Sequence, residues 1–166
     1  MSYSFQCCDA IQVSIFIEKQ GLLFYEKAAK KAEDPEVKKI FSKLAEEEKE
    51  HLQSLNAKSQ FLQPALKNKS AVRRDVELFI AEEIEGRVFP RLDELSDDEN
   101  FPTNDLEALE LGILSEKRSI EILSTLLHKE KKIDVRVIFS HLMVEEKKHL
   151  ALLEVMKAEC LAKNSA

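Results

Sequence analysis

The sequence IFSKLAEEEKEHL at residues 40–52 is repeated as IFSHLMVEEKKHL at residues 138–150, and this repeat decides the fold. The two stretches are identical at nine of thirteen positions, without a gap, and lie 98 residues apart. Self-similarity at a fixed offset indicates an internal structural repeat. Both copies carry the motif Glu-x-x-His: Glu48 with His51, and Glu146 with His149.

A second pair of segments is related by the same offset. IFIEK at residues 15–19 aligns with ILSEK at residues 113–117, which pairs Glu18 with Glu116. The chain therefore carries two matched glutamates and two Glu-x-x-His motifs. Four-helix bundles that bind two metal ions through carboxylates use this set, with one glutamate or one motif projecting inward from each helix.

Length, charge and cysteine content restrict the class of protein. A chain of 166 residues is expected to form one domain with a substantial core. The net charge of −6 argues against a nucleic-acid partner. Three cysteines do not make the framework of a secreted disulfide protein, so we expect a reducing, cytoplasmic location. No apolar run approaches the roughly 20 residues of a membrane span, and no signal peptide is recognisable, so no membrane partner is expected.

Helical periodicity fills most of the sequence, and only three glycines and four prolines interrupt it. We therefore predict an all-α protein. Its expected architecture is a ferritin-like four-helix bundle of two repeated helical hairpins, joined by a long crossover that contains a short helix. Residues 1–166 form a single domain, with the repeat at about 9–56 and 107–154 and the crossover at 57–103.

The boundaries of the main helices follow from capping residues and breakers. Asp34 and Asn104 are the expected N-caps of the second and third helices. The crossover helix is expected to end at Gly86, and residues 88–103 read as loop. The four main helices are predicted at about 9–32, 35–56, 104–129 and 134–160.

The candidate ligands lie on the seams of the predicted helices, which are otherwise apolar except at Tyr25. An uncompensated carboxylate in such an interior is strongly unfavourable. Two divalent cations would balance four carboxylates, and two neutral imidazoles would complete the ligand set. The predicted metal ligands are Glu18, Glu48, His51, Glu116, Glu146 and His149.

The donor types indicate which metal and which roles to expect. Carboxylate oxygens and imidazole nitrogens without thiolates favour iron or manganese over structural zinc. Glu48 and Glu146 each share a helix face with a histidine one turn later, which predicts that they bridge the two ions. Glu18 and Glu116 are then the terminal ligands.

These motifs resemble those of the rubrerythrin family of the ferritin-like superfamily, over nearly the whole chain. The resemblance is carried by Glu18-x6-Tyr25 with Ala28-Ala29, Leu44-Ala45-x-x-Glu48-x-x-His51, Ala108 to Glu116-Lys117, and Glu145-Glu146-x-x-His149. It implies a non-haem di-iron protein, with a manganese or mixed pair as alternatives. It also implies a rubrerythrin-like peroxidase or oxidase that reacts with hydrogen peroxide or dioxygen. We further expect a homodimer.

Two departures from the family pattern bear on activity. The best-known members carry a second glutamate three residues after the third-helix ligand, where this chain has Ser119. The six ligands are therefore closer to those of bacterioferritin-like and other di-iron oxidase centres. Such members also carry a rubredoxin domain with paired CxxC motifs, which this sequence lacks. We therefore expect electrons to come from a separate, rubredoxin-like donor protein.

Several functions and residue roles stay open at this point. The alternatives to an oxidoreductase are a ferroxidase or iron-handling protein, and a metal-binding helical interaction module without redox turnover. Tyr25 either hydrogen-bonds a ligand carboxylate, acts as a redox residue, or is an ordinary core tyrosine. Glu47 and Glu145 flank the seams and are expected to be partly exposed charges, with carboxylates that swing in to join the metal ligands as the alternative. The remaining candidates are expected to lie outside the centre: Glu110, His128, His141, Cys7 and Cys8.

Overall fold

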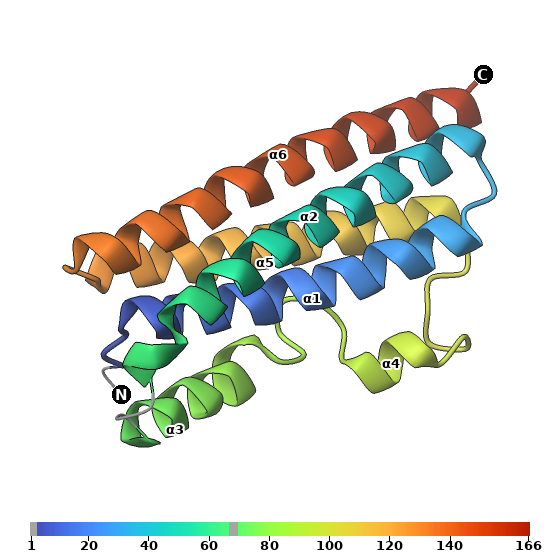
Figure 1. The fold of residues 1–166 in the computed structure, drawn as a ribbon. Helices are drawn as coiled ribbons and strands as arrows, with labels where there is room; N and C mark the ends of the chain where they lie inside the picture. The colour runs from blue at the N-terminus through green and yellow to red at the C-terminus, as the bar shows by residue number, and fades with distance from the viewer. Residues whose placement is uncertain (1–2, 67–69) are drawn as a thin grey trace.

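The computed structural model describes residues 3–66 and 70–166, and every regular element within these ranges is helical. The predicted all-α class is confirmed. Four long helices lie side by side (Figure 1): α1 (Cys7–Lys31), α2 (Pro35–Leu66), α5 (Asp105–Lys129) and α6 (Ile133–Asn164). Shorter elements lie between α2 and α5: α3 (Ser70–Phe79), the π-helical turn η1 (Ile80–Ile84) and α4 (Leu92–Ser96).

The long helices form two antiparallel pairs, α1 with α2 and α5 with α6 (Figure 1). Helix α2 ends and α5 begins at opposite ends of the molecule, so these two helices run in the same direction. The segment between them, which includes α3 and α4, runs along the outer side of α1. Helix α6 also packs against α1 and α2, so the four long helices enclose a shared interior.

The starts of α2 and α5 follow the capping signals in the sequence. A carboxylate oxygen of Asp34 accepts a 2.8 Å hydrogen bond from the backbone N–H of Glu36. The side-chain oxygen of Asn104 accepts a 2.9 Å bond from the N–H of Glu107. The Glu107 carboxylate in turn accepts a bond from Thr103, one residue before the cap, which makes this a variant of the capping box. Both predicted caps are confirmed.

Two predictions about the helices were wrong, one about the end of α2 and one about the segment at residues 88–103. Helix α2 continues to Leu66 instead of ending near residue 56, because residues 57–62 contain neither glycine nor proline to stop it. Helix α4 lies within residues 88–103, which were expected to be loop. With five residues, α4 is too short to produce a recognisable helical period in the sequence.

The segment after η1 contributes to the core as well as to the connection. Gly86 has a φ of 71°, a left-handed conformation that favours glycine, and the chain turns there as predicted. The turn places Phe89, which is 1% exposed, against α1. Its ring centroid lies 5.7 Å from that of Phe24 and 6.0 Å from that of Tyr25. The connection therefore covers α1 beside the centre described below.

The seams expected at alternating steps of three and four residues match burial best on α6, where all seven seam residues are buried: Val135, Phe139, Leu142, Glu146, His149, Leu153 and Met156. On α1 and α2 the seam residues Ile15, Leu22 and Leu55 are only half-buried. Helix α1 buries a second face instead, because Phe89 and Phe101 of the connection pack against Phe24. Within the described ranges, no helix combines the length and the apolar character that crossing a membrane requires.

Candidate metal centre

The six predicted ligands converge in the interior of the four long helices. Helix α1 supplies Glu18 and α5 supplies Glu116, while α2 and α6 each supply a Glu-x-x-His pair. All except His51 are at most 1% exposed: Glu18, Glu48, Glu116, Glu146 and His149. The side chain of His51 is 24% exposed. Residues that lie far apart in sequence thus place four carboxylates and two imidazoles in one enclosed region.

Their donor atoms form two groups that share one carboxylate. In each group, one donor atom from every residue lies within 4.8 Å of the others. The first group contains Glu18, Glu48 and His51, and the second contains Glu48, Glu116, Glu146 and His149. Glu48 belongs to both groups, which is the arrangement expected of a bridging ligand. Glu146 belongs to the second group alone, so its predicted bridging role stays a prediction.

Many of these buried polar atoms have no hydrogen-bond partner in the protein. Buried polar atoms are normally paired, since leaving one unpaired costs free energy. The unpaired atoms at the centre are Glu18 Oε1, Glu48 Oε2, Glu116 Oε2, both carboxylate oxygens of Glu146 and both ring nitrogens of His149. Oxygen and imidazole donors gathered in this way fit two divalent cations such as iron or manganese. The residues present therefore suit the metal pair that the sequence predicts.

Burial also changes the pKa values of Glu48 and Glu146. Desolvation raises the pKa of Glu48 well above the ordinary value, and the neighbouring charge of Glu18 raises it further. Desolvation likewise raises the pKa of Glu146, and the charges of Glu116 and Glu18 add to the shift. These two carboxyl groups therefore keep their protons to higher pH than exposed glutamates do, and bound cations would oppose this shift.

Both histidines direct Nδ1 toward the carboxylates. Nδ1 of His51 lies 3.3 Å from Oε2 of Glu18 and 3.9 Å from Oε2 of Glu48. Nδ1 of His149 lies 3.4 Å from Oε1 of Glu48 and 3.4 Å from Oε1 of Glu116. Nδ1 is therefore the nitrogen of each ring that is placed to bind a metal ion.

The outer nitrogen of each ring faces a glutamate of the other repeat. Nε2 of His149 on α6 lies 3.4 Å from Oε2 of Glu47 on α2. Nε2 of His51 on α2 lies 3.5 Å from Oε2 of Glu145 on α6. Both glutamates are partly exposed, as predicted, but each also approaches a ligand histidine, which the sequence analysis missed. The sequence could have indicated these contacts, because EEKEH at residues 47–51 and EEKKH at residues 145–149 both place a glutamate directly before the Glu-x-x-His motif. That glutamate flanks the helix face that carries the motif.

Tyr25 is fully buried, and its hydroxyl donates a hydrogen bond to Oε1 of Glu116. The proposed contact between this tyrosine and a ligand carboxylate is therefore present. Burial raises the pKa of Tyr25 well above its ordinary value, and the charge of Glu116 adds to the shift. The phenol consequently stays protonated and remains a donor.

The repeat also aligns two small residues that lie against the Glu-x-x-His glutamates. Gly21 on α1 corresponds to Ser119 on α5 at the 98-residue offset. A Cβ on Gly21 would lie 2.7 Å from Oε1 of Glu48, so the missing side chain leaves room for that carboxylate. The hydroxyl of Ser119 lowers the pKa of Glu146 and so partly opposes the effect of burial. The role of Gly21 was missed, although a glycine in the middle of a predicted helix is a recognisable signal.

The other candidates belong to neither ligand group. Glu110 is exposed and pairs with Lys157 at 3.1 Å, and His128 and His141 are exposed as predicted. Cys7 and Cys8 are half-buried free thiols, and desolvation raises the pKa of both, which lowers their reactivity.

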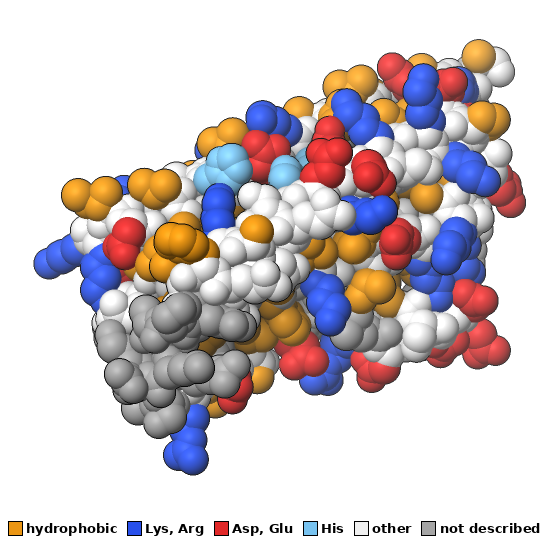
Figure 2. Space-filling model, viewed as in Figure 1, with side chains coloured by type: hydrophobic (Ala, Val, Ile, Leu, Met, Phe, Trp, Pro, Cys, Tyr) orange, Lys and Arg blue, Asp and Glu red, His pale blue; other side chains and the backbone are white. Residues whose placement is uncertain are grey.

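A pocket of about 240 Å³ connects the first ligand group with the surface between α2 and α6. Glu18 and His51 line its inner part, and Glu145 and His141 also contribute. Figure 2 shows histidine atoms at the surface where α2 and α6 meet, beside acidic side chains. The first group therefore has a path to solvent.

Comparison with known proteins identifies the family of the chain. The sequence model of the family described as Rubrerythrin matches residues 9–157, which includes all six candidate ligands. No curated protein and no solved structure gave a significant match. The match extends over most of the chain, and the chain therefore belongs to the rubrerythrin family.

Proposed function

We propose that this member of the rubrerythrin family is a ferritin-like bundle of two repeated hairpins that binds two iron ions. A manganese or mixed pair is the alternative. We further propose that it reduces hydrogen peroxide or dioxygen with electrons from a separate protein. The observation that carries the proposal is the pair of buried ligand groups joined through Glu48, with most of their donor atoms unpaired.

A bound pair of reduced ions would supply the two electrons needed to cleave an O–O bond while both oxygens are held. Reduction of hydrogen peroxide to two water molecules also consumes two protons. The chain contributes ligands, orientation and a controlled supply of water. Glu18 and His51 lie at the solvent-connected group, so protons and oxidant would reach the centre on this side.

The surrounding residues fix the ligands and limit access of water. Tyr25 donates to Glu116 and so holds that carboxylate in one orientation. Phe24, Phe41 and Phe89 are at most 1% exposed, and their rings pack around Tyr25. Electrostatic interactions are stronger in such an apolar surrounding than in water.

The choice between oxidants rests on two considerations. Family membership favours hydrogen peroxide. Ser119, at the position where well-known members carry another glutamate, removes a carboxylate and favours an oxidase-like centre. We propose hydrogen peroxide as the faster oxidant, with dioxygen as the alternative.

Stopped-flow oxidation of the anaerobic, iron-loaded protein tests this function. No CxxC pair for a rubredoxin-type iron occurs in the sequence, so we expect one round of oxidation that then stops. Further turnovers should require an added electron-transfer protein or artificial donor. Faster reaction with dioxygen would indicate an oxidase, and accumulation of many ferric ions per chain would indicate iron storage. Two bound ions that react with neither oxidant would indicate a binding module.

A further inference from the structure

We propose that the pocket between α2 and α6 is the entrance through which divalent cations reach the centre, and that the equivalent route at the other half of the repeat is closed. This inference rests on the proposed two-metal centre. It predicts that the two ligand groups are loaded from one side, through the group that contains His51.

The open side joins solvent to an unpaired ligand atom. The pocket of about 240 Å³ is lined by Ser14, Glu18, His51 and Ser54, among others. Glu18 is 1% exposed, and its Oε1 has no hydrogen-bond partner. A cation that enters the pocket would therefore meet a buried, unsatisfied oxygen next to the nitrogen of His51. Exposure follows the same asymmetry, because His51 is 24% exposed whereas His149 is 0% exposed.

The internal repeat identifies what closes the other side. At the 98-residue offset, the pocket residues Ser54 and Lys58 correspond to Leu152 and Met156. Leu152 is half-buried and Met156 is 3% exposed. A larger apolar leucine thus replaces the short serine, and an apolar methionine of similar size replaces the charged lysine of the open side.

A second replacement acts on the helix that carries the terminal glutamate. Ser14 lines the open pocket, and its counterpart is Gly112. A Cβ on Gly112 would lie 3.3 Å from Cδ1 of Leu153, so this leucine packs directly against α5. Leu153 is fully buried, whereas its counterpart Leu55 is half-buried at the open pocket. The space that is open near His51 is therefore filled near His149.

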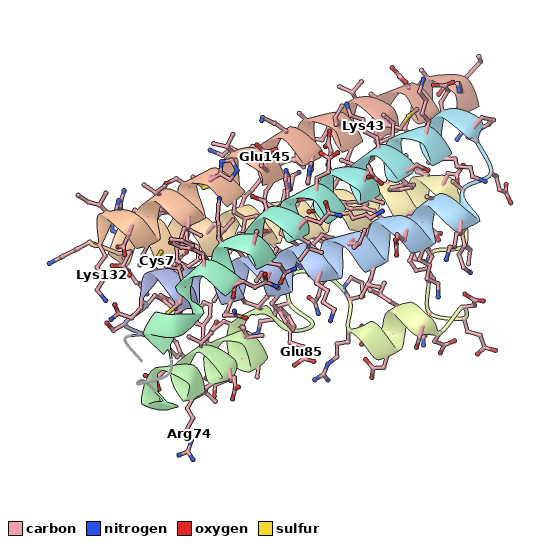
Figure 3. All side chains as sticks on the ribbon, viewed as in Figure 1. Cys7, Lys43, Arg74, Glu85, Lys132 and Glu145 are labelled. Atoms are coloured by element: carbon pink, nitrogen blue, oxygen red, sulfur yellow. The ribbon has the colours of Figure 1, made fainter. Side chains whose placement is uncertain are left out.

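The charged residues at the rim of the open pocket also differ from those at the corresponding positions of the closed side. The open side presents Glu145 and His141, and the corresponding residues of the closed side are Glu47 and Lys43. Figure 3 shows Glu145 extending from α6 and Lys43 from α2. An imidazole can bind a divalent cation, whereas the lysine ammonium repels one. Lys58 also lines the open pocket and opposes a cation there, so the inference depends on open space more than on charge.

The test transfers the closing residues to the open side. The variant S54L/K58M should slow both the uptake of Co²⁺ and its release to a chelator by about tenfold or more, because both steps cross the same added barrier. The equilibrium affinity and the stoichiometry should not change. Stopped-flow absorbance of bound Co²⁺ measures all four quantities. If the double variant does not fold by circular dichroism, S54F provides the same obstruction with one substitution.

Two controls separate obstruction from charge and from general perturbation. K58M alone removes a positive charge and should leave uptake unchanged or faster. Gln53→Leu alters an exposed neighbour on α2 that does not line the pocket, and should have no effect. Unchanged rates of Co²⁺ uptake and release in S54L/K58M, or a change in affinity alone, would contradict the proposed entrance. Failure of the unmodified protein to bind two Co²⁺ ions would instead contradict the proposed metal centre.

Discussion

At the scale of single residues, Gly21 marks the place where the α1 backbone lies close to Glu48, the proposed bridging ligand. The contact of 2.7 Å between a Cβ at this position and Oε1 of Glu48 is closer than real Cβ contacts allow. We predict that Gly21→Ala displaces the Glu48 carboxylate and weakens metal binding by about 10–100-fold, as expected for changes that misorient a ligand. The metal-free protein should change in stability by only about 1 kcal/mol, because alanine favours the helix while the carboxylate end can move. Metal titration and chemical denaturation measure the two effects.

Gly112→Ala is the matched control for this prediction. A Cβ at Gly112 would meet Leu153 and Phe24 at 3.3–3.4 Å and no metal ligand. The substitution should therefore alter the stability of the protein without altering its metal affinity. Equal losses of affinity in the two alanine variants would show that Gly21 has no specific role beside Glu48.

Tyr25 provides a second test at this scale. Tyr25→Phe removes the donor to Glu116 and leaves a buried carboxylate oxygen unpaired. We expect the free energy of unfolding of the metal-free protein to fall by about 1–3 kcal/mol, the usual cost of leaving a buried donor or acceptor unpaired. The other tyrosine, Tyr3, donates to exposed Glu82, so Tyr3→Phe should have little effect. Equal denaturation midpoints for both variants would contradict the structural role of Tyr25.

The candidate ligands could be predicted from sequence because helical periodicity assigns each residue to a face. Glu18 and Glu116 follow from the repeat, and the Glu-x-x-His spacing places each glutamate and histidine one turn apart. Gly21 could not be assigned a role in this way. Its importance depends on how closely α1 approaches Glu48 of α2, and that distance is a property of packing between helices.

At the scale of elements, α2 and α6 each place a glutamate beside a histidine of the other helix. Glu47 of α2 faces His149 of α6, and Glu145 of α6 faces His51 of α2. A carboxylate on the outer nitrogen of a ligand histidine favours the proton there and leaves Nδ1 free for the metal. The repeat thus allows each hairpin to orient the candidate ligand histidine of the other.

This arrangement predicts that Glu47→Ala and Glu145→Ala each weaken metal binding by about 10–100-fold while the two-ion stoichiometry is retained. Nitrogen NMR of the imidazoles should also show a larger fraction of the tautomer with its proton on Nδ1. Glu46→Ala is the control, because Glu46 is exposed, lies 4.0 Å from Lys49 and belongs to neither ligand group. Affinities that match that control would reduce Glu47 and Glu145 to ordinary surface charges.

The elements were predicted where caps and long periodic segments define them, and were missed where they are short. Asp34 and Asn104 located the starts of α2 and α5. The five residues of α4 carry too little periodicity to be recognised, and their helical form depends on packing against α1. The contact of Phe89 with Tyr25 is likewise a tertiary contact, which the loop-like sequence around Phe89 does not predict.

At the scale of the whole molecule, the buried cluster couples folding to pH. The pKa values of Glu48 and Glu146 are raised above 4.5, chiefly by desolvation. The pKa of His51 is raised above 6.5 by its contact with Glu18. Burial lowers the pKa of His149, but Glu116, Glu18 and Glu47 together raise it by more, so the net shift is upward. All four groups hold their protons more strongly in the folded chain than in the unfolded chain.

The metal-free protein is therefore predicted to lose stability as pH rises. The carboxyl groups contribute their full stabilisation below pH 4.5, and the histidines below pH 6.5. Each contribution is lost as the pH rises through the raised pKa that the group has in the folded chain. Each proton released contributes a slope of about 1.4 kcal/mol per pH unit. Denaturation with and without metal measures this trend, which bound cations should largely remove. Equal stability of the metal-free protein from mildly acid to mildly alkaline pH would contradict a cluster gathered in one dry interior.

The central claim is that one chain binds two metal ions in a single site joined through Glu48. Anaerobic titration with Fe²⁺, followed by metal counting, tests it most directly. We predict two ions per chain, loss of the pair in Glu48→Gln, and retention of both ions in Glu110→Ala, whose side chain is exposed and paired with Lys157. A stoichiometry of one, or equal loss of metal in the Glu48 and Glu110 variants, would contradict the two-metal centre.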